Sequence, residues 1–121
     1  MRFMVIVKAT KESEAGVMPP KELIDAMGRY NEELAKAGVR VSAEGLQPSS
    51  KGARLRIAGS QRTVIDGPFA ETNELVAGFW IWNVASKAEA IEWARHCPNP
   101  HAGTEAEIEI RQIFEAEDFG Q

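Results

Sequence analysis

Residues 66–84, which read DGPFAETNELVAGFWIWNV, decide the fold of this chain. The second half of the stretch, from Leu75 to Val84, is almost unbroken in its apolar character and has the length of a buried strand. The first half, from Asp66 to Thr72, is a polar turn, because Asp can bond its own backbone and Gly permits positive φ. The stretch therefore predicts a central strand that begins beside a turn rich in carboxylates.

Length and composition indicate one soluble domain. A chain of 121 residues buries roughly two-thirds of its unfolded surface, so we interpret residues 1–121 as a single domain whose acidic tail, from about residue 115, is loosely held. The net charge of −4 argues against nucleic-acid binding, since phosphate contacts need a basic surface. No apolar run reaches the ~20 residues of a membrane helix. No predicted helix is both basic and amphipathic, so we do not expect binding to a membrane surface.

The location of the protein is predicted from its N-terminus and its cysteine content. The first ten residues lack the long apolar region and the cleavage site of a signal peptide, so we expect a cytoplasmic protein. Cys97 is the only cysteine, which excludes an internal disulfide and fits a reducing compartment.

Periodicity and turn signals predict six strands and two helices along the chain. The first helix opens at Pro19-Pro20, carries an apolar stripe that includes Tyr30, and ends at Gly38. The second helix opens with a capping box at Ser86 and ends before Pro98. Strands are predicted over residues 3–7, 39–46, 53–58, 61–65, 75–84 and 107–111, and the third and fourth form a hairpin around Gly59-Ser60.

Without the hairpin, this order is the ferredoxin-like βαββαβ arrangement, an α+β fold with both helices on one face of an antiparallel sheet. The other face should then be polar, yet residues 75–84 are apolar on both faces. A second copy of the chain, packed sheet on sheet in a homodimer, is the expected cover, and we place Trp80 on the face that it covers. The alternative is that the hairpin folds over this face within the same chain.

Carboxylates near the turn are the first candidates for chemistry. Asp66 and Glu71 flank the turn, and Glu44 lies on a neighbouring strand. Carboxylates at the mouth of an apolar cavity can have raised pKa values and act as general acid or base. An ordinary turn with solvated charges explains the same residues, so both interpretations stay open.

Other polar side chains give less specific signals. Tyr30 lies on the apolar stripe of the first helix, so its hydroxyl either reaches the site or stays in the core. Arg54, Arg56 and Arg62 on the hairpin could bind a carboxylate or phosphate, or simply protect a strand edge from aggregation. His101 is a further acid–base candidate, since its loop could fold toward the end of the sheet.

Metal and cofactor chemistry are not expected. Pro98 and Pro100 separate His96, Cys97 and His101, and no Cys-x-x-Cys or His-Glu-x-x-His motif is present. Cys97 has no evident basic neighbour that would lower its pKa, so we do not expect a nucleophile. The sequence also lacks a phosphate-binding glycine loop and a Gly-x-Ser-x-Gly elbow.

Several runs of residues together resemble the DGPF-motif branch of the YCII-related family. The most specific is the DGPFAET run at 66–72, and the resemblance covers nearly the whole chain. The other matching runs are YNEEL at 30–34, AEGLQP at 43–48, GFW at 78–80, the helix at 89–98 and EIEIR at 107–111.

The resemblance implies a dimeric α+β barrel in a superfamily that includes small isomerases, monooxygenases and haem-handling proteins. Members of the YCII group are proposed enzymes with a His–Asp acid/base pair in a cleft. The family His falls near Met27 in this sequence, so that pair is absent as such. Asp66 matches the motif Asp, and Glu44 lies in the Glu-Gly-Leu segment of the branch. Some members of the branch look linked to extracytoplasmic-function sigma factors.

We therefore hypothesise a small cofactor-independent enzyme of isomerase or lyase type that acts on a small polar organic molecule. Asp66 is its general acid or base, and Glu44 sets the pKa of Asp66. The expected substrate-binding residues are Arg54, Arg56, Phe69, Glu71 and Trp80. The alternative is a non-catalytic ligand-binding or regulatory module, and a haem or flavin monooxygenase ranks third, by superfamily analogy alone.

Overall fold

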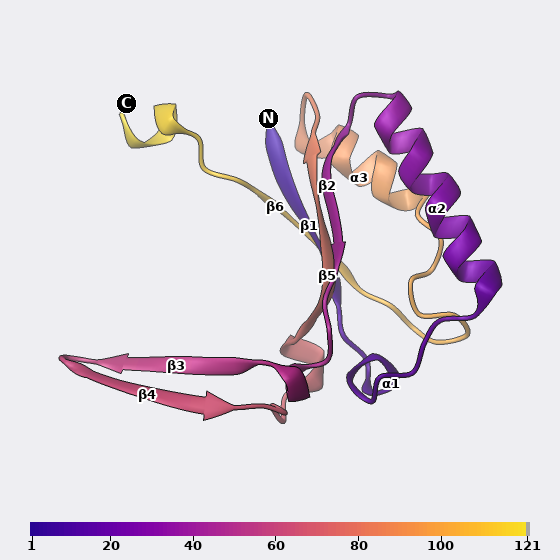
Figure 1. The fold of residues 1–121 in the computed structure, drawn as a ribbon. Helices are drawn as coiled ribbons and strands as arrows, with labels where there is room; N and C mark the ends of the chain where they lie inside the picture. The colour runs from indigo at the N-terminus through magenta and orange to yellow at the C-terminus, as the bar shows by residue number, and fades with distance from the viewer. Residues whose placement is uncertain (121) are drawn as a thin grey trace.

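The computed structural model describes residues 1–120 and, within them, every side chain except that of Asn73. A four-stranded antiparallel sheet carries two helices on one face, and a two-stranded hairpin projects from it (Figure 1). The sheet consists of β1 (Arg2–Lys8), β2 (Arg40–Gly45), β5 (Val76–Asn83) and β6 (Ile108–Gln112). The helices are α1 (Lys11–Glu14), α2 (Lys21–Lys36) and α3 (Lys87–Arg95), and the hairpin is β3 (Ala53–Ala58) with β4 (Gln61–Asp66).

The order of the strands across the sheet is β2-β5-β1-β6, and every pair is antiparallel. With α2 and α3 on one face, the molecule is an α+β fold consistent with the predicted ferredoxin-like arrangement. The short helix α1 lies in a segment that we expected to be a polar loop. Thr10 Oγ1 accepts from the Ser13 N–H and Ser13 Oγ accepts from the Thr10 N–H, and this reciprocal pair caps the helix.

The ends of α2 and α3 follow the predicted signals. α2 starts after Pro20, and Gly38 ends it with a φ of +73°, a value that favours glycine. Ser86 Oγ accepts from the Glu89 N–H at 3.1 Å at the start of α3. These local signals fix the helix ends and so place the apolar stripe of α2 over the sheet.

The core lies between the sheet and the two helices. Trp82 is fully buried there, and Trp80 is 5% exposed with its ring 5.9 Å from that of Tyr30 in an edge-to-face contact. Our placement of Trp80 on the open face was therefore wrong. The strand is apolar on both faces, so alternation separated its two sets of side chains but did not tell which set faces the helices.

The opposite face of the sheet has no cover in the described chain. In the strand register Met4 lies beside Ile81, and Ile6 lies beside Phe79. These four side chains, the apolar centre of the open face, are only partly buried. The same two rows continue outward to more polar residues on the edge strands, namely Arg111, Glu109, Ser42 and Glu44.

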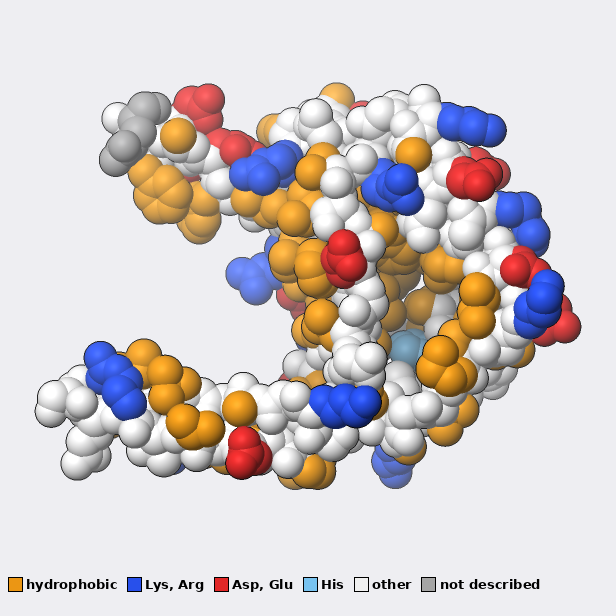
Figure 2. Space-filling model, in the orientation of Figure 1, with side chains coloured by type: hydrophobic (Ala, Val, Ile, Leu, Met, Phe, Trp, Pro, Cys, Tyr) orange, Lys and Arg blue, Asp and Glu red, His pale blue; other side chains and the backbone are white. Residues whose placement is uncertain are grey.

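The hairpin β3–β4 does not fold over this face. It extends away from the body as a separate arm, and its residues are exposed apart from a half-buried Ile65 (Figure 1). Leu55, Ile57 and Val64 are each more than half exposed on the arm. Figure 2 shows a wide notch between the arm and the C-terminal segment, with hydrophobic side chains along it.

Candidate functional site

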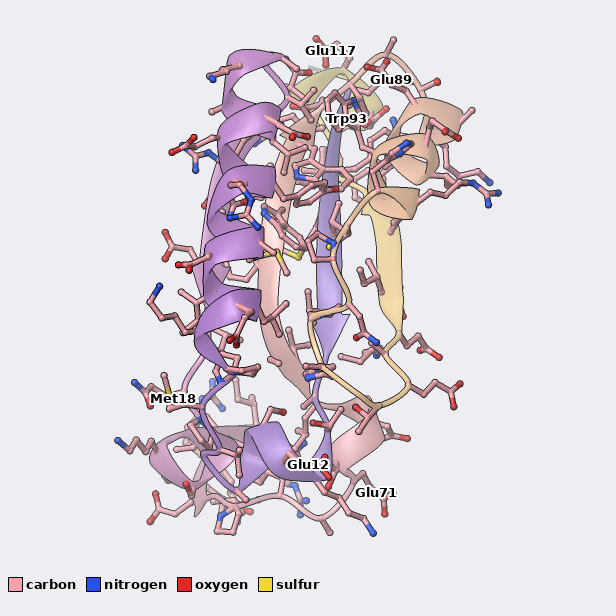
Figure 3. The ribbon with its side chains drawn as sticks, turned by 90° about the vertical axis from the view of Figure 1, so that its right-hand side faces the viewer. Glu12, Met18, Glu71, Glu89, Trp93 and Glu117 are labelled. Atoms are coloured by element: carbon pink, nitrogen blue, oxygen red, sulfur yellow. The ribbon has the colours of Figure 1, made fainter. Side chains whose placement is uncertain are left out.

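A cavity lies on the helix side of the sheet, at the foot of α2. Its volume is about 620 Å³, within the range of roughly 300–1,000 Å³ that is usual for small-molecule pockets. Met27 and Asn31 of α2 form one wall. The other walls come from α1 with the loop that follows it, from residues 43–48 and 77–80, and from the loop at 100–104. Figure 3 looks at this side, with Met18 below α2 and Glu12 on α1.

Small residues on the sheet create the space. Ala43 and Gly45 of β2 lie opposite Trp80 and Gly78 of β5, on the side that faces α2. A Cβ atom at Gly78 would lie 2.8 Å from the carbonyl oxygen of Glu44, so the two backbones approach too closely for a side chain there. A Cβ atom at Gly45 would meet nothing within 4 Å. At Gly45 and Gly78 the floor of the pocket is therefore formed by backbone.

His101 enters the wall from the loop that follows α3. Its Nε2 lies 2.7 Å from the Lys8 carbonyl oxygen, which can only accept, so Nε2 carries a proton. The loop is held by further bonds: Asn99 Oδ1 accepts from the His101 N–H, and the Thr104 hydroxyl and N–H both donate to the His101 carbonyl. Nδ1 has no hydrogen-bond partner among the described residues, so in the neutral ring it is a free acceptor.

Asn31 supplies the opposite polar function. Its Oδ1 accepts from the Trp80 indole N–H at 2.6 Å, which assigns the orientation of the amide. The Nδ2 group therefore faces away from the indole and has no hydrogen-bond partner in the part of the chain that the structure describes. The pocket thus combines apolar walls with a free amide donor and a free imidazole acceptor.

Comparison with known proteins identifies the family of this chain. The YCII-related domain matches residues 1–115. This chain belongs to the YCII-related family. An uncharacterized protein of Rhizobium meliloti (strain 1021), R00369, is similar to it, with 34% identity over 104 residues that cover 86% of this chain and 78% of the relative.

Three of the residues selected from the sequence of this YCII-related protein line the pocket: Glu44, Trp80 and His101. Trp80 and His101 lie on the helix side or in the loop above it. Glu44 belongs to the edge strand and lies beside Phe79 in the register, so its side chain is directed toward the open face. Its carbonyl oxygen, which approaches Gly78, is the part of Glu44 that borders the cavity.

Asp66 does not line this pocket. It is the last residue of β4, lies opposite Ala53, and is exposed. Among the described residues its carboxylate makes no hydrogen bond or ion pair, and no contact joins it to Glu44. Glu71 is also exposed and borders a separate cavity of about 310 Å³ beside Thr10. A catalytic role for Asp66 stays a prediction.

The arm residues also lie outside the pocket. The Arg54 guanidinium carbon is 3.8 Å from the centroid of the Phe69 ring, a cation–π contact between β3 and the DGPF turn. Arg56 is exposed farther along β3, opposite Thr63. Arg54 and Phe69 therefore hold the base of the arm, and neither lines the wall of the cavity.

Tyr30 and Cys97 are buried in ways that remove them from acid–base chemistry at neutral pH. The Tyr30 hydroxyl donates to the Trp93 carbonyl at 2.7 Å, and burial raises the pKa of Tyr30 well above its usual range. Burial also raises the pKa of the Cys97 thiol to about 11. Neither side chain lines the pocket.

Ser49 has a structural role near the pocket that the sequence did not reveal. Its Oγ accepts from the Phe69 N–H at 3.1 Å and donates to the Glu14 carboxylate, while its own N–H donates to Glu14 Oε1 at 3.0 Å. The DGPF turn is thereby tied to the loops that border the pocket. No local signal in the sequence could have shown this role, because it depends on contacts with Glu14 and Phe69, which lie 35 and 20 residues away.

The described residues lack two features that would have indicated a particular class of function. No helix there combines the length and the apolar character needed to cross a membrane. No group of three or more His, Cys, Asp or Glu side chains is placed to hold a metal ion in that part of the chain.

Proposed function

We propose that this YCII-related protein binds a small organic molecule in the pocket beside α2, and that His101 is the acid–base group of that site. The observation that carries the proposal is the fixed tautomer of His101, whose Nε2 proton is held by the Lys8 carbonyl. An imidazole held in this way takes up a proton at Nδ1, which is what a general base requires.

The position of Met27 adds support. The family resemblance places a histidine near this residue of α2, and Met27 itself cannot carry a proton. Met27 and His101 line the same cavity from different elements. The imidazole that α2 lacks is therefore supplied by the loop at 100–104.

The chemistry that fits is proton abstraction next to a carbonyl, as in an isomerase or lyase. His101 Nδ1 accepts the proton, and Asn31 Nδ2 donates to the oxygen on which negative charge develops. The sequence-based hypothesis made Asp66 the general acid or base and let Glu44 set the pKa of Asp66. The pocket supports His101 better, because Asp66 lies outside the cavity and the Glu44 side chain is directed toward the other face.

We further propose that the protein is a homodimer of the DGPF branch. The apolar centre of the open face, bordered by Arg111 and Glu109 on one edge strand and Glu44 on the other, has the pattern of an interface with a polar rim. A two-fold dimer pairs such a surface with itself. The run at 66–72 supports membership of the branch.

Binding is tested with a pair of variants at one position. Gly45→Leu fills the pocket from the floor, and Gly45→Ala adds one carbon into open space. We expect acetophenone, a small aryl ketone, to shift the Trp80 indole resonance in the wild type and in Gly45→Ala, but not in Gly45→Leu. Equal shifts in all three proteins would place the ketone outside the pocket and overturn the proposal.

Proton abstraction is tested with the same ketone, by following the loss of its methyl proton signal in D₂O. General-base catalysis typically contributes on the order of 100-fold or more, so we expect His101→Gln to abolish most of the protein-dependent exchange. Asp66→Asn serves as the comparison and should leave the rate unchanged. Loss of exchange in Asp66→Asn alone would restore the Asp66 hypothesis, and binding without exchange in the wild type would indicate a non-catalytic binding module.

A further inference from the structure

We infer that the pocket takes an uncharged, largely apolar ligand with one hydroxyl or carbonyl group and that it rejects anions. The inference rests on the proposed function, because it names the ligand class of the same pocket. It differs from the sequence-based expectation that hairpin arginines bind a carboxylate or phosphate.

The charges around the cavity argue against an anionic ligand. The described residues that line it include neither a lysine nor an arginine, and Glu12 of α1 adds an acidic residue to the wall. Lys8 lies close by through its backbone carbonyl, yet its ammonium group is directed to Glu109 at 3.7 Å. A carboxylate or phosphate would therefore lose its hydration in the pocket without gaining a cation, which is strongly unfavourable.

The walls favour an apolar ligand body. Trp80 presents an aromatic ring, and Met27 presents a flexible thioether, a group that packs well against aromatic rings. Val7, Val17 and Leu46 add to the apolar lining. The indole N–H of Trp80 is already bonded to Asn31, so the ring offers the ligand no free polar group.

The two free polar groups define what the ligand must carry. Asn31 Nδ2 can only donate, and His101 Nδ1 in the neutral ring can only accept. A hydroxyl group can satisfy either of them, because it can accept from an amide and donate to an imidazole. A carbonyl oxygen satisfies the amide alone. A ligand with neither group would leave both protein groups unpaired on binding.

Two aromatic probes of similar size, benzyl alcohol and benzoate, test whether the pocket rejects anions. Each is titrated at pH 8, and the Trp80 indole resonance is followed. We expect benzyl alcohol to bind and benzoate to bind at least about tenfold more weakly. Benzoate binding as tightly as the alcohol would overturn the inference while leaving the proposed binding function intact. If neither benzyl alcohol nor benzoate nor acetophenone shifted the resonance, both the inference and the proposed function would be overturned.

A gain-of-binding variant addresses the missing cation directly. Met18 lines the rim of the cavity and is 77% exposed, so a polar replacement should fold normally (Figure 3). Met18→Lys should strengthen benzoate binding several-fold and leave benzyl alcohol unchanged, whereas Met18→Gln should do neither. An equal gain for benzoate in both variants would show that charge does not set the preference, and the inference would fail.

Discussion

The backbone carbonyl oxygen of Ser49 occupies the place where a side chain at Gly67 would begin. A Cβ atom built at Gly67 would lie 1.8 Å from that oxygen and 2.6 Å from the Ser49 carbonyl carbon. Atoms that are not bonded to each other do not approach so closely, so a side chain at Gly67 would force the backbone to shift. The glycine of the DGPF motif therefore has a steric reason in this molecule, since it lets the turn lie directly against residues 49–50.

The first prediction follows from this contact. Gly67→Ala should lower the free energy of unfolding by about 1–3 kcal/mol, because the turn or residue 49 must move. Gly52→Ala is the matched control, since a Cβ atom there would lie 3.6 Å from the same oxygen, an ordinary contact. Urea denaturation compares the variants. Equal stabilities for Gly67→Ala and Gly52→Ala would contradict the steric explanation.

The second prediction concerns the Ser49 side chain. Ser49→Ala removes the hydroxyl that joins the Phe69 N–H to the Glu14 carboxylate, and we expect a loss of about 1–2 kcal/mol. Amide hydrogen exchange should rise at Phe69, which loses its acceptor. Ser50→Ala, at an exposed neighbour, is the control and should change neither quantity. Unchanged exchange at Phe69 in Ser49→Ala would mean that the hydroxyl does not hold the turn.

The third prediction separates the two faces of β5. Ile81→Glu places a charge in the apolar centre of the open face, so the proposed dimer should dissociate while the chain stays folded. Trp80→Glu buries the charge in the core beside Tyr30 and should unfold the protein. Sedimentation equilibrium with circular dichroism distinguishes these results. A wild-type monomer, or an unchanged dimer in Ile81→Glu, would contradict the proposed interface.

Local signals predicted much of the fold. The hairpin was placed within one residue because Gly59-Ser60 and the flanking alternation are encoded next to each other. The capping serine of α3 and the closing glycine of α2 are equally local. The short helix α1 was missed because its only signal is one pair of side chains, Thr10 and Ser13, over four residues.

The pocket could not be predicted in the same way, because it depends on contacts between distant segments. Its space comes from Ala43, Gly45 and Gly78, whose small side chains carry no chemical signal. Its polar groups, Asn31 and His101, lie seventy residues apart and gain their roles from the Trp80 indole and a backbone carbonyl. Asp66 attracted the functional interpretation because it lies in a distinctive motif, and the contacts that this motif makes through Gly67 and Phe69 hold the base of the arm.

The last prediction uses Tyr30, the only tyrosine of the chain. Burial raises its pKa in the folded protein above the ordinary value of about 10, so the native state holds the phenol proton more tightly than the unfolded state. The stabilising contribution is therefore complete below about pH 10 and is lost as the pH rises beyond it. Tyrosinate absorbance at high pH should appear together with unfolding by circular dichroism. In guanidinium chloride the same absorbance should appear near pH 10.

Tyr30→Phe leaves the Trp93 carbonyl without its donor and should cost about 1 kcal/mol at neutral pH, but it should lose less stability than the wild type above pH 10. Tyrosinate formation near pH 10 in the folded protein would show that the hydroxyl is open to solvent and would return Tyr30 to the candidates for the site.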